Sequence, residues 1–178
     1  MQYYYTDREY KELLSNMRII CTTNEQRNEH IKAYFDKKGI RYIDRALKTG
    51  DYCFRIDACP ALGFSMDTYF TNELFIERKN SIDELATSIT NEAFHYELKR
   101  AQDIEHKYLL VEQAGGWGDL LKNNYRSQYN VKAFWGTLHT LEVKYNLKIH
   151  FLDKSQIGAD IYVICKSILD SKIIKTGV

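Results

Sequence analysis

Short apolar runs alternate with helix-spaced amphipathic patterns along the whole chain of 178 residues. The strand-like runs lie at 18–23, 41–47, 52–56, 73–79, 108–111 and 147–152. The helical patterns lie at 6–16, 25–38, 81–89, 91–105, 131–145 and 161–169. Because only one proline, Pro60, interrupts the chain, this alternation predicts a single α/β domain over 1–178, with one mixed central sheet flanked by helices.

Capping residues support several of the helix boundaries. Thr6 with Glu9, and Ser81 with Glu84, match the capping box that opens a helix. Asn24 is expected to cap the helix that ends at Gly39. The connections 57–71 and 115–118 are expected to be loops, and the glycine-rich second one lacks the Lys-Ser/Thr of a P-loop.

Charge and cysteine usage limit the classes of partner. Twenty-five Lys and Arg balance twenty-four Asp and Glu, so affinity for nucleic acid has to come from a local basic patch. No apolar run approaches the 18 residues of a membrane span and no signal peptide is visible, so a cytoplasmic protein, not a secreted one, is expected. The four cysteines form no CxxC pair and are predicted to be buried free thiols.

The run 73–79 carries the chemistry. Alternate residues of a strand share a face, so Glu77 and Lys79 are expected to point the same way, roughly 7 Å apart, with Arg78 on the other face. If Asp51 pairs alongside, two carboxylates and an amine meet at one strand end. Carboxylates bind hard cations, and a lysine stabilises phosphate charge, so this set suits Mg²⁺-assisted phosphodiester hydrolysis. Asp83, at the start of the next helix, is expected to reach the same pocket.

Each of these residues also has an ordinary structural interpretation. Gly50-Asp51 alone is typical of a turn, and Glu77-Arg78-Lys79 alone is typical of a charged strand end. Asp83 alone is typical of the carboxylates that helix N-termini favour. The combination of all of them favours a functional site.

Taken together, Gly50-Asp51, then Glu77-Arg78-Lys79, then Asp83 after three residues, resembles the GD...ERKxxxD motif of the XPF family of structure-specific endonucleases. The resemblance covers most of the chain and looks like the nuclease domain alone. It implies a restriction-endonuclease-like core, cleavage of branched DNA such as forks or flaps, dependence on Mg²⁺ or Mn²⁺, and a homodimer formed through the C-terminal helices.

The resemblance also assigns roles to residues. Asp51, Glu77 and Asp83 match metal-associated acidic positions, Glu25 matches a further one, Lys79 matches the catalytic amine, and Arg78 matches a motif position. Lys99 and Arg100, on the following helix, are expected with Arg78 to contact DNA. Three positions depart from the family pattern. Thr22 stands where an Asp is frequent, Ala93 where an Arg is expected, and Glu97 where a Gln is expected.

The apolar stretch Ile161–Cys165 bears on assembly. Five consecutive apolar residues on a helix point in nearly every direction, so a second copy is expected to cover part of them. The alternative is that the N-terminal segment, with Leu13 and Leu14, folds over this surface.

Two other functions compete with the metal-dependent endonuclease. A catalytically inactive DNA-binding or scaffold subunit is the main alternative, although inactive partners usually lose motif carboxylates that are present here. A purely structural interaction domain ranks last, because it leaves the converging charges without a reason.

Overall fold

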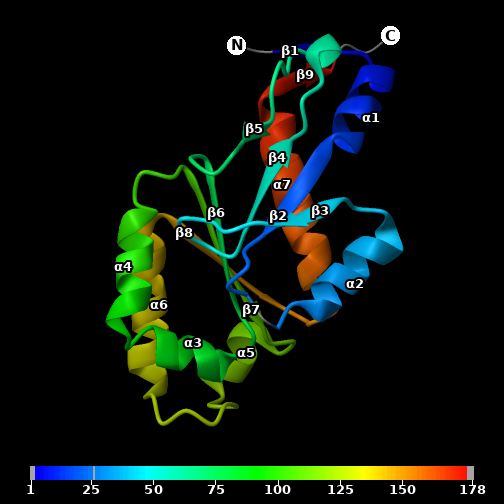
Figure 1. The fold of residues 1–178 in the computed structure, drawn as a ribbon. Helices are drawn as coiled ribbons and strands as arrows, with labels where there is room; N and C mark the ends of the chain where they lie inside the picture. The colour runs from blue at the N-terminus through cyan, green and yellow to red at the C-terminus, as the bar shows by residue number, and fades with distance from the viewer. Residues whose placement is uncertain (1–2, 26, 176–178) are drawn as a thin grey trace.

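The computed structural model describes residues 3–25 and 27–175, and within them a mixed sheet is covered by helices on both faces (Figure 1). Its strand order is β3-β2-β4-β6-β7-β8, with β5 added to β4. The strands are β2 (Met17–Cys21), β3 (Tyr42–Asp44), β4 (Tyr52–Ile56), β5 (Thr68–Tyr69), β6 (Leu74–Lys79), β7 (His106–Glu112) and β8 (Leu147–Leu152). The predicted α/β class, with a restriction-endonuclease-like mixed sheet, is confirmed.

Strand direction gathers several chain segments at one edge of the sheet. β6, β7 and β8 run parallel, so their carboxyl ends share an edge. β4 is antiparallel to both β2 and β6, so β4 begins, and β2 ends, at that same edge. The residues just before β4, just after β2 and at the end of β6 therefore lie close together, as the sequence predicted for Asp51 and Glu77.

Seven helices in the described residues form the two outer layers. The helices on one face are α3 (Ile82–Ser88), α4 (Glu92–Arg100), α5 (Gly116–Leu121) and α6 (Val131–Tyr145), and those on the other are α1 (Asp7–Ser15), α2 (Glu29–Lys38) and α7 (Ile157–Ser171) (Figure 1). A single-turn 3₁₀ helix, Pro60–Leu62, lies between β4 and β5. None of the described helices is long and apolar enough to cross a membrane.

Each helical layer packs its own hydrophobic core against the sheet. On β6, Phe75 joins the core beneath α3, α4 and α6, whereas Leu74 and Ile76 join the core beneath α2 and α7. The period-2 alternation continues into the polar end of the strand, so Glu77 and Lys79 face the α4 layer and Arg78 faces the α2 layer.

Much of the apolar surface of α7 is covered within one chain, while Val163 is 54% exposed, so the homodimer expected there remains a prediction. Ile161, Ile164 and Cys165 are at most 5% exposed. Residues of α1 share their core, and Tyr10 of α1 donates a hydrogen bond to Asp170 of α7 at 2.6 Å. The alternative interpretation, in which the N-terminal segment folds over α7, is confirmed. A small parallel sheet of β1 (Tyr3–Tyr5) and β9 (Ile173–Lys175), not predicted, joins the same two segments.

Several boundaries differ from those predicted. α2 begins at Glu29, after the cap residue Asn28, because the segment after β2 turns toward β6 and is held there by Glu25. β3 ends at Asp44 and α4 at Arg100, both earlier than expected. The glycine-rich segment is a short helix, α5, because burial of Leu120 stabilises a turn that composition alone does not favour.

Candidate active site

Gly50 and Asp51 form a tight entry into β4. Gly50 has a φ of 76°, and a Cβ at this position would lie 3.0 Å from both the Ile76 carbonyl oxygen and the Phe75 ring. Only glycine fits such a left-handed, crowded position without strain. The turn presses Asp51 onto β6, where its backbone N–H donates to Ile76 at 2.7 Å and its Oδ2 accepts from the Arg78 backbone N–H at 2.9 Å.

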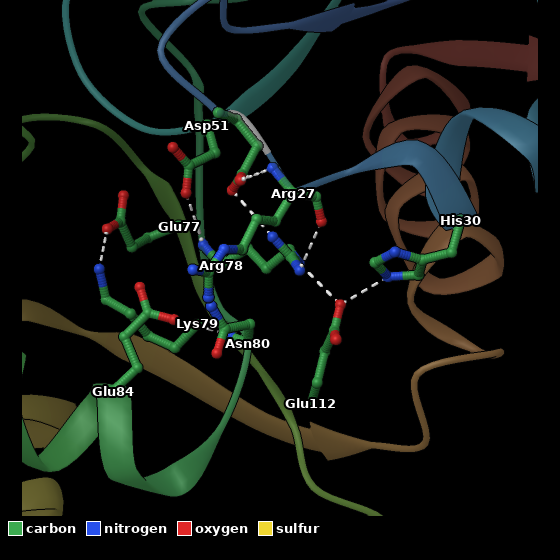
Figure 2. Close-up of polar contacts among 10 residues, drawn as sticks. Arg27, His30, Asp51, Glu77, Arg78, Lys79, Asn80, Glu84 and Glu112 are labelled. Atoms are coloured by element: carbon green, nitrogen blue, oxygen red, sulfur yellow. Dashed lines mark hydrogen bonds and ion pairs between the residues drawn. The ribbon is translucent and has the colours of Figure 1, made fainter.

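Glu77 and Lys79 form an ion pair beside Asp51. Lys79 Nζ donates to Glu77 Oε1 at 2.5 Å, and the whole Glu77 and Lys79 residues are only 5% and 8% exposed. The Lys79 ammonium also lies 5.1 Å from the centre of the Phe94 ring of α4. The predicted convergence of two carboxylates and one amine at this edge is therefore present in the fold (Figure 2).

Burial perturbs the protonation of this cluster. Desolvation raises the pKa of both Asp51 and Glu77. Repulsion from Asp51 raises the pKa of Glu77 further, and repulsion from Glu25 and Glu97 raises that of Asp51. Desolvation alone would lower the pKa of Lys79, but its pair with Glu77 outweighs burial and raises it. Lys79 therefore holds its proton more firmly than a free lysine, which suits a charge stabiliser better than a base.

Arg78 lies on the opposite face of β6 and holds a buried polar network. Its guanidinium contacts Glu25 at 3.0 Å, Glu112 at 2.7 Å and the Arg27 carbonyl oxygen at 3.0 Å. Glu112 also contacts His30 Nε2 at 2.6 Å (Figure 2). The Arg78 side chain is only 2% exposed. The expectation that Arg78 contacts DNA phosphate is corrected by this burial, because all three donor nitrogens are occupied inside the protein.

Glu25, expected at the metal, is partly committed elsewhere. Its Oε2 pairs with Arg78, and its Oε1 accepts from the Arg27 backbone N–H at 3.0 Å. It still lies close enough to raise the pKa of Asp51 by repulsion. The structure thus assigns Glu25 first to the Arg78 network. The neighbouring Thr22 is 3% exposed, and its backbone N–H donates to the Asp51 carbonyl oxygen at 2.8 Å.

Glu97 is a site residue that sequence reasoning noted only as a departure. From α4, its Oε1 accepts from the Gly50 backbone N–H at 3.0 Å and lies 3.4 Å from Thr49 Oγ1. It also raises the pKa of both Asp51 and Glu77 by repulsion. Glu97 is therefore a further carboxylate beside the pair.

Asp83 is directed to a loop, and among the described residues no hydrogen bond or ion pair joins it to the carboxylate pair. Its Oδ1 accepts from the backbone N–H groups of Arg126 and Ser127, each at 2.7 Å. The expectation that Asp83 reaches the same pocket as Asp51 and Glu77 is corrected. Its carboxylate instead accepts two backbone hydrogen bonds from the loop between α5 and α6.

Lys99 and Arg100 end α4 on the protein surface. Arg100 has a side chain that is 64% exposed, and its guanidinium lies 3.9 Å from the Glu97 carboxylate. Lys99 is also exposed. Both cations are therefore available to phosphate, next to the helix that holds Glu97, as expected for a DNA contact.

The chemistry of the donors decides whether a divalent cation fits. The described part of the chain has no cluster of three or more His, Cys, Asp or Glu side chains arranged to hold a metal. Mg²⁺, however, retains several waters and is commonly bound by one or two carboxylates together with substrate phosphate. Asp51 and Glu77 supply two carboxylates whose mutual repulsion a cation would relieve. The residues therefore fit Mg²⁺ or Mn²⁺ bound jointly with a DNA phosphate.

Comparisons with known proteins agree with this geometry. Residues 22–165 match the family described as the ERCC4 domain. No curated protein matches the sequence. Among solved structures, XPF from Aeropyrum pernix superposes with a TM-score of 0.62 at 17% identity, over 85% of this chain and 65% of that chain. XPF from Aeropyrum pernix in complex with DNA gives 0.61 at 17% identity, over 86% and 66%. This chain thus spans just under two thirds of those chains.

Proposed function

Because the chain belongs to the ERCC4 domain family, a family of structure-specific DNA endonucleases, we propose that it is a metal-dependent endonuclease that hydrolyses phosphodiester bonds in branched DNA. The observation that carries this proposal is the convergence of Asp51, Glu77 and Lys79 at one buried strand edge. The similar XPF protein from Aeropyrum pernix is known in complex with DNA, and this supports DNA as the proposed substrate class here.

The residues divide the chemistry between them. Asp51 and Glu77 would hold the divalent cation, which supplies Lewis-acid stabilisation of the phosphate when bound. Lys79, kept protonated by its pair with Glu77, would stabilise negative charge that develops on the phosphate. Arg78 acts through the backbone: its anchored side chain fixes the strand whose N–H orients the Asp51 carboxylate.

DNA and a second copy are the proposed partners. Lys99 and Arg100 would contact the phosphates at the end of α4, where their exposure leaves them free to release counterions from DNA. We further infer a homodimer through the C-terminal helices α6 and α7, supported by the family resemblance and by the exposed Trp135, Val143 and Val163. Sedimentation velocity at micromolar concentration tests it, and a strictly monomeric mass, with or without branched DNA, would refute it.

The competing function is an inactive DNA-binding or scaffold subunit. Labelled single-stranded, duplex, flap, fork and four-way DNA, incubated with and without Mg²⁺ or Mn²⁺, separates the two. We expect cleavage of branched substrates that requires the metal. Asp51→Asn, Glu77→Gln and Lys79→Ala should each lower the rate on the order of 100-fold or more while DNA binding remains.

The matched control is Glu105→Gln, since the Glu105 side chain is 74% exposed. Metal-dependent cleavage at near wild-type rates by all three folded site variants would refute the assigned site. Metal-independent DNA binding with no cleavage of any substrate would favour the scaffold function.

A further inference from the structure

A groove of about 660 Å³ opens between the β3–β4 connection and the end of α4. Its walls come from the β3–β4 connection, from β5 and the turn after it, and from the end of α4. The residues that matter here are Arg45, Leu47, Thr49, Tyr69, Leu74 and Arg100. This volume falls in the range of small-ligand sites, roughly 300–1,000 Å³, and is large enough for one nucleotide.

The groove adjoins the carboxylate pair through Thr49 and Glu97. Thr49 lines the groove, and the next two residues along the chain are Gly50 and Asp51. Glu97 Oε1 contacts the Gly50 N–H on the catalytic side and Arg100 Nη2, at 3.9 Å, on the groove side. The groove therefore begins two residues from Asp51 along the chain, with Glu97 between them in space.

Charge and polarity in the groove match a nucleotide. Three exposed cations, Arg45, Lys48 and Arg100, lie on its rim against one acid, Asp103, although the whole chain has a net charge of only +1. Its interior includes buried apolar side chains, contributed by Cys53, Leu74 and Ile104. A base needs an apolar surface and a phosphate needs cations, so both requirements are met in one concavity.

An aromatic ring adds a preformed platform. Tyr69 is half-buried in the wall, and the Arg45 guanidinium lies 4.4 Å from its ring centre. Arg55 also contacts the Tyr69 hydroxyl at 2.8 Å, which fixes the ring from behind. A fixed aromatic ring and a guanidinium plane are both surfaces on which a base stacks.

We propose that this groove binds one unpaired nucleotide of the DNA strand that is cut, with its base against Leu47 and Tyr69 and its phosphate at the basic rim. The inference rests on the proposed endonuclease function and adds a reason for substrate choice. A base inside a duplex is stacked and paired on both sides and cannot enter a concave pocket without leaving the helix. Strand ends and flaps offer such a base at no unpairing cost, so the groove would favour branched over duplex DNA.

An abasic scan tests the groove. Flap substrates each lacking one base, at successive positions around the incision, are cleaved by wild type in Mg²⁺. We expect kcat/KM to fall about 5- to 150-fold at one position only, which corresponds to stacking of about 1–3 kcal/mol per base. Leu47→Ala removes a half-buried side chain from the groove wall. In this variant, the loss of kcat/KM caused by the missing base at that position should be less than about twofold. The matched control Leu121→Ala, an exposed leucine on α5, should leave the penalty unchanged.

A binding measurement keeps this test separate from that of the enzymatic proposal. The fluorescent base 2-aminopurine, scanned along the same strand with the Lys79→Ala variant, should change in emission at the same position, and Leu47→Ala should abolish the change. Cleavage with no base-sensitive position, or a penalty that Leu47→Ala leaves intact, would overturn the groove while sparing the endonuclease. DNA binding and a 2-aminopurine response without any cleavage would overturn the endonuclease while supporting the groove. Absence of DNA binding would overturn both.

Discussion

Asp51→Asn should stabilise the protein increasingly as the pH rises. The wild-type carboxylate is held in a buried site beside Glu77, and burial followed by repulsion raises the pKa of Asp51 from an ordinary 3.8 to about 7. Between these two values the folded chain keeps a proton that the unfolded chain has lost. The folded state then binds more protons than the unfolded state, so the free energy of unfolding falls as pH rises through this window. An amide has no proton to lose and keeps an oxygen to accept from the Arg78 N–H.

The pKa of Asp51 sets the size of the effect. A rise from 3.8 to about 7 penalises the charged form by ~4 kcal/mol at alkaline pH, and ~3 kcal/mol of this develops between about pH 5 and about pH 8.5. This is a ceiling, because Asp51 and Glu77 repel each other and their titrations are linked. We expect the stability difference between variant and wild type to grow by ~2 kcal/mol over that range. For a chain of this length, that is a growth of about 4–8 °C in the difference in melting temperature.

Thermal melts of both proteins across this pH range, without divalent metal, measure the difference. Glu12→Gln is the control, because Glu12 is exposed on α1 and exchanges charge for amide without burial, so its difference from wild type should stay flat. A melting difference for Asp51→Asn that does not grow with pH would refute the conclusion that an ionised Asp51 is penalised in the folded protein. Added Mg²⁺ should raise the wild-type melting temperature more at alkaline than at acidic pH and should leave Asp51→Asn nearly unchanged.

Three further substitutions address the neighbouring contacts. Glu97→Gln keeps an acceptor for the Gly50 N–H but removes a charge that raises the pKa of both Asp51 and Glu77. The acid limb of the pH–rate profile should therefore move to lower pH, and an unmoved limb would contradict the electrostatic role of Glu97. Asp83→Ala removes the acceptor for two loop N–H groups, so it should speed proteolysis between α5 and α6 and change the rate of DNA cleavage only a few-fold. A loss of cleavage rate near 100-fold, with the loop still resistant to proteolysis, would instead support a role for Asp83 at the metal. Arg78→Met removes the cation that two largely buried acids share and should cost about 3–5 kcal/mol, or roughly 6–20 °C in melting temperature, while Arg100→Met at an exposed position should cost under about 1 kcal/mol; equal losses would contradict the buried network.

The local spacing of apolar residues predicted an element correctly wherever that element's own residues determine its type and length. The helix 131–145 and the strands 52–56 and 147–152 lie where the sequence placed them, because their apolar spacing fixes both type and length. The alternation along β6 likewise placed Glu77 with Lys79 and opposite Arg78. Where a distant contact decides, pattern was insufficient. Nothing local distinguishes the short strands β1 and β9, which exist because they pair with each other.

The misplaced site residues have the same physical origin. Asp83 and Glu97 both sit on helices, and their backbone positions were predicted well enough. Their side chains, however, accept hydrogen bonds from other segments of the chain. Asp83 accepts from the loop N–H groups of Arg126 and Ser127, and Glu97 accepts from the N–H of Gly50. Those donors are not visible from the spacing of acids along the chain. A motif therefore identifies which residues matter, but the roles of its members depend on the partners that the fold brings to them.

The two faces of β6 explain how one strand end can carry strained electrostatics and still be rigid. On one face, Asp51 and Glu77 repel each other in a buried setting that favours a bound cation. On the other face, Arg78 is held by Glu25 and Glu112. The β6 backbone next to Glu77 therefore cannot move away from the repulsion. The Arg78 N–H, which orients Asp51, belongs to that anchored residue. The cost of keeping the carboxylates together is thus offset on the opposite face of β6, by the residue next to Glu77 whose backbone N–H donates to Asp51.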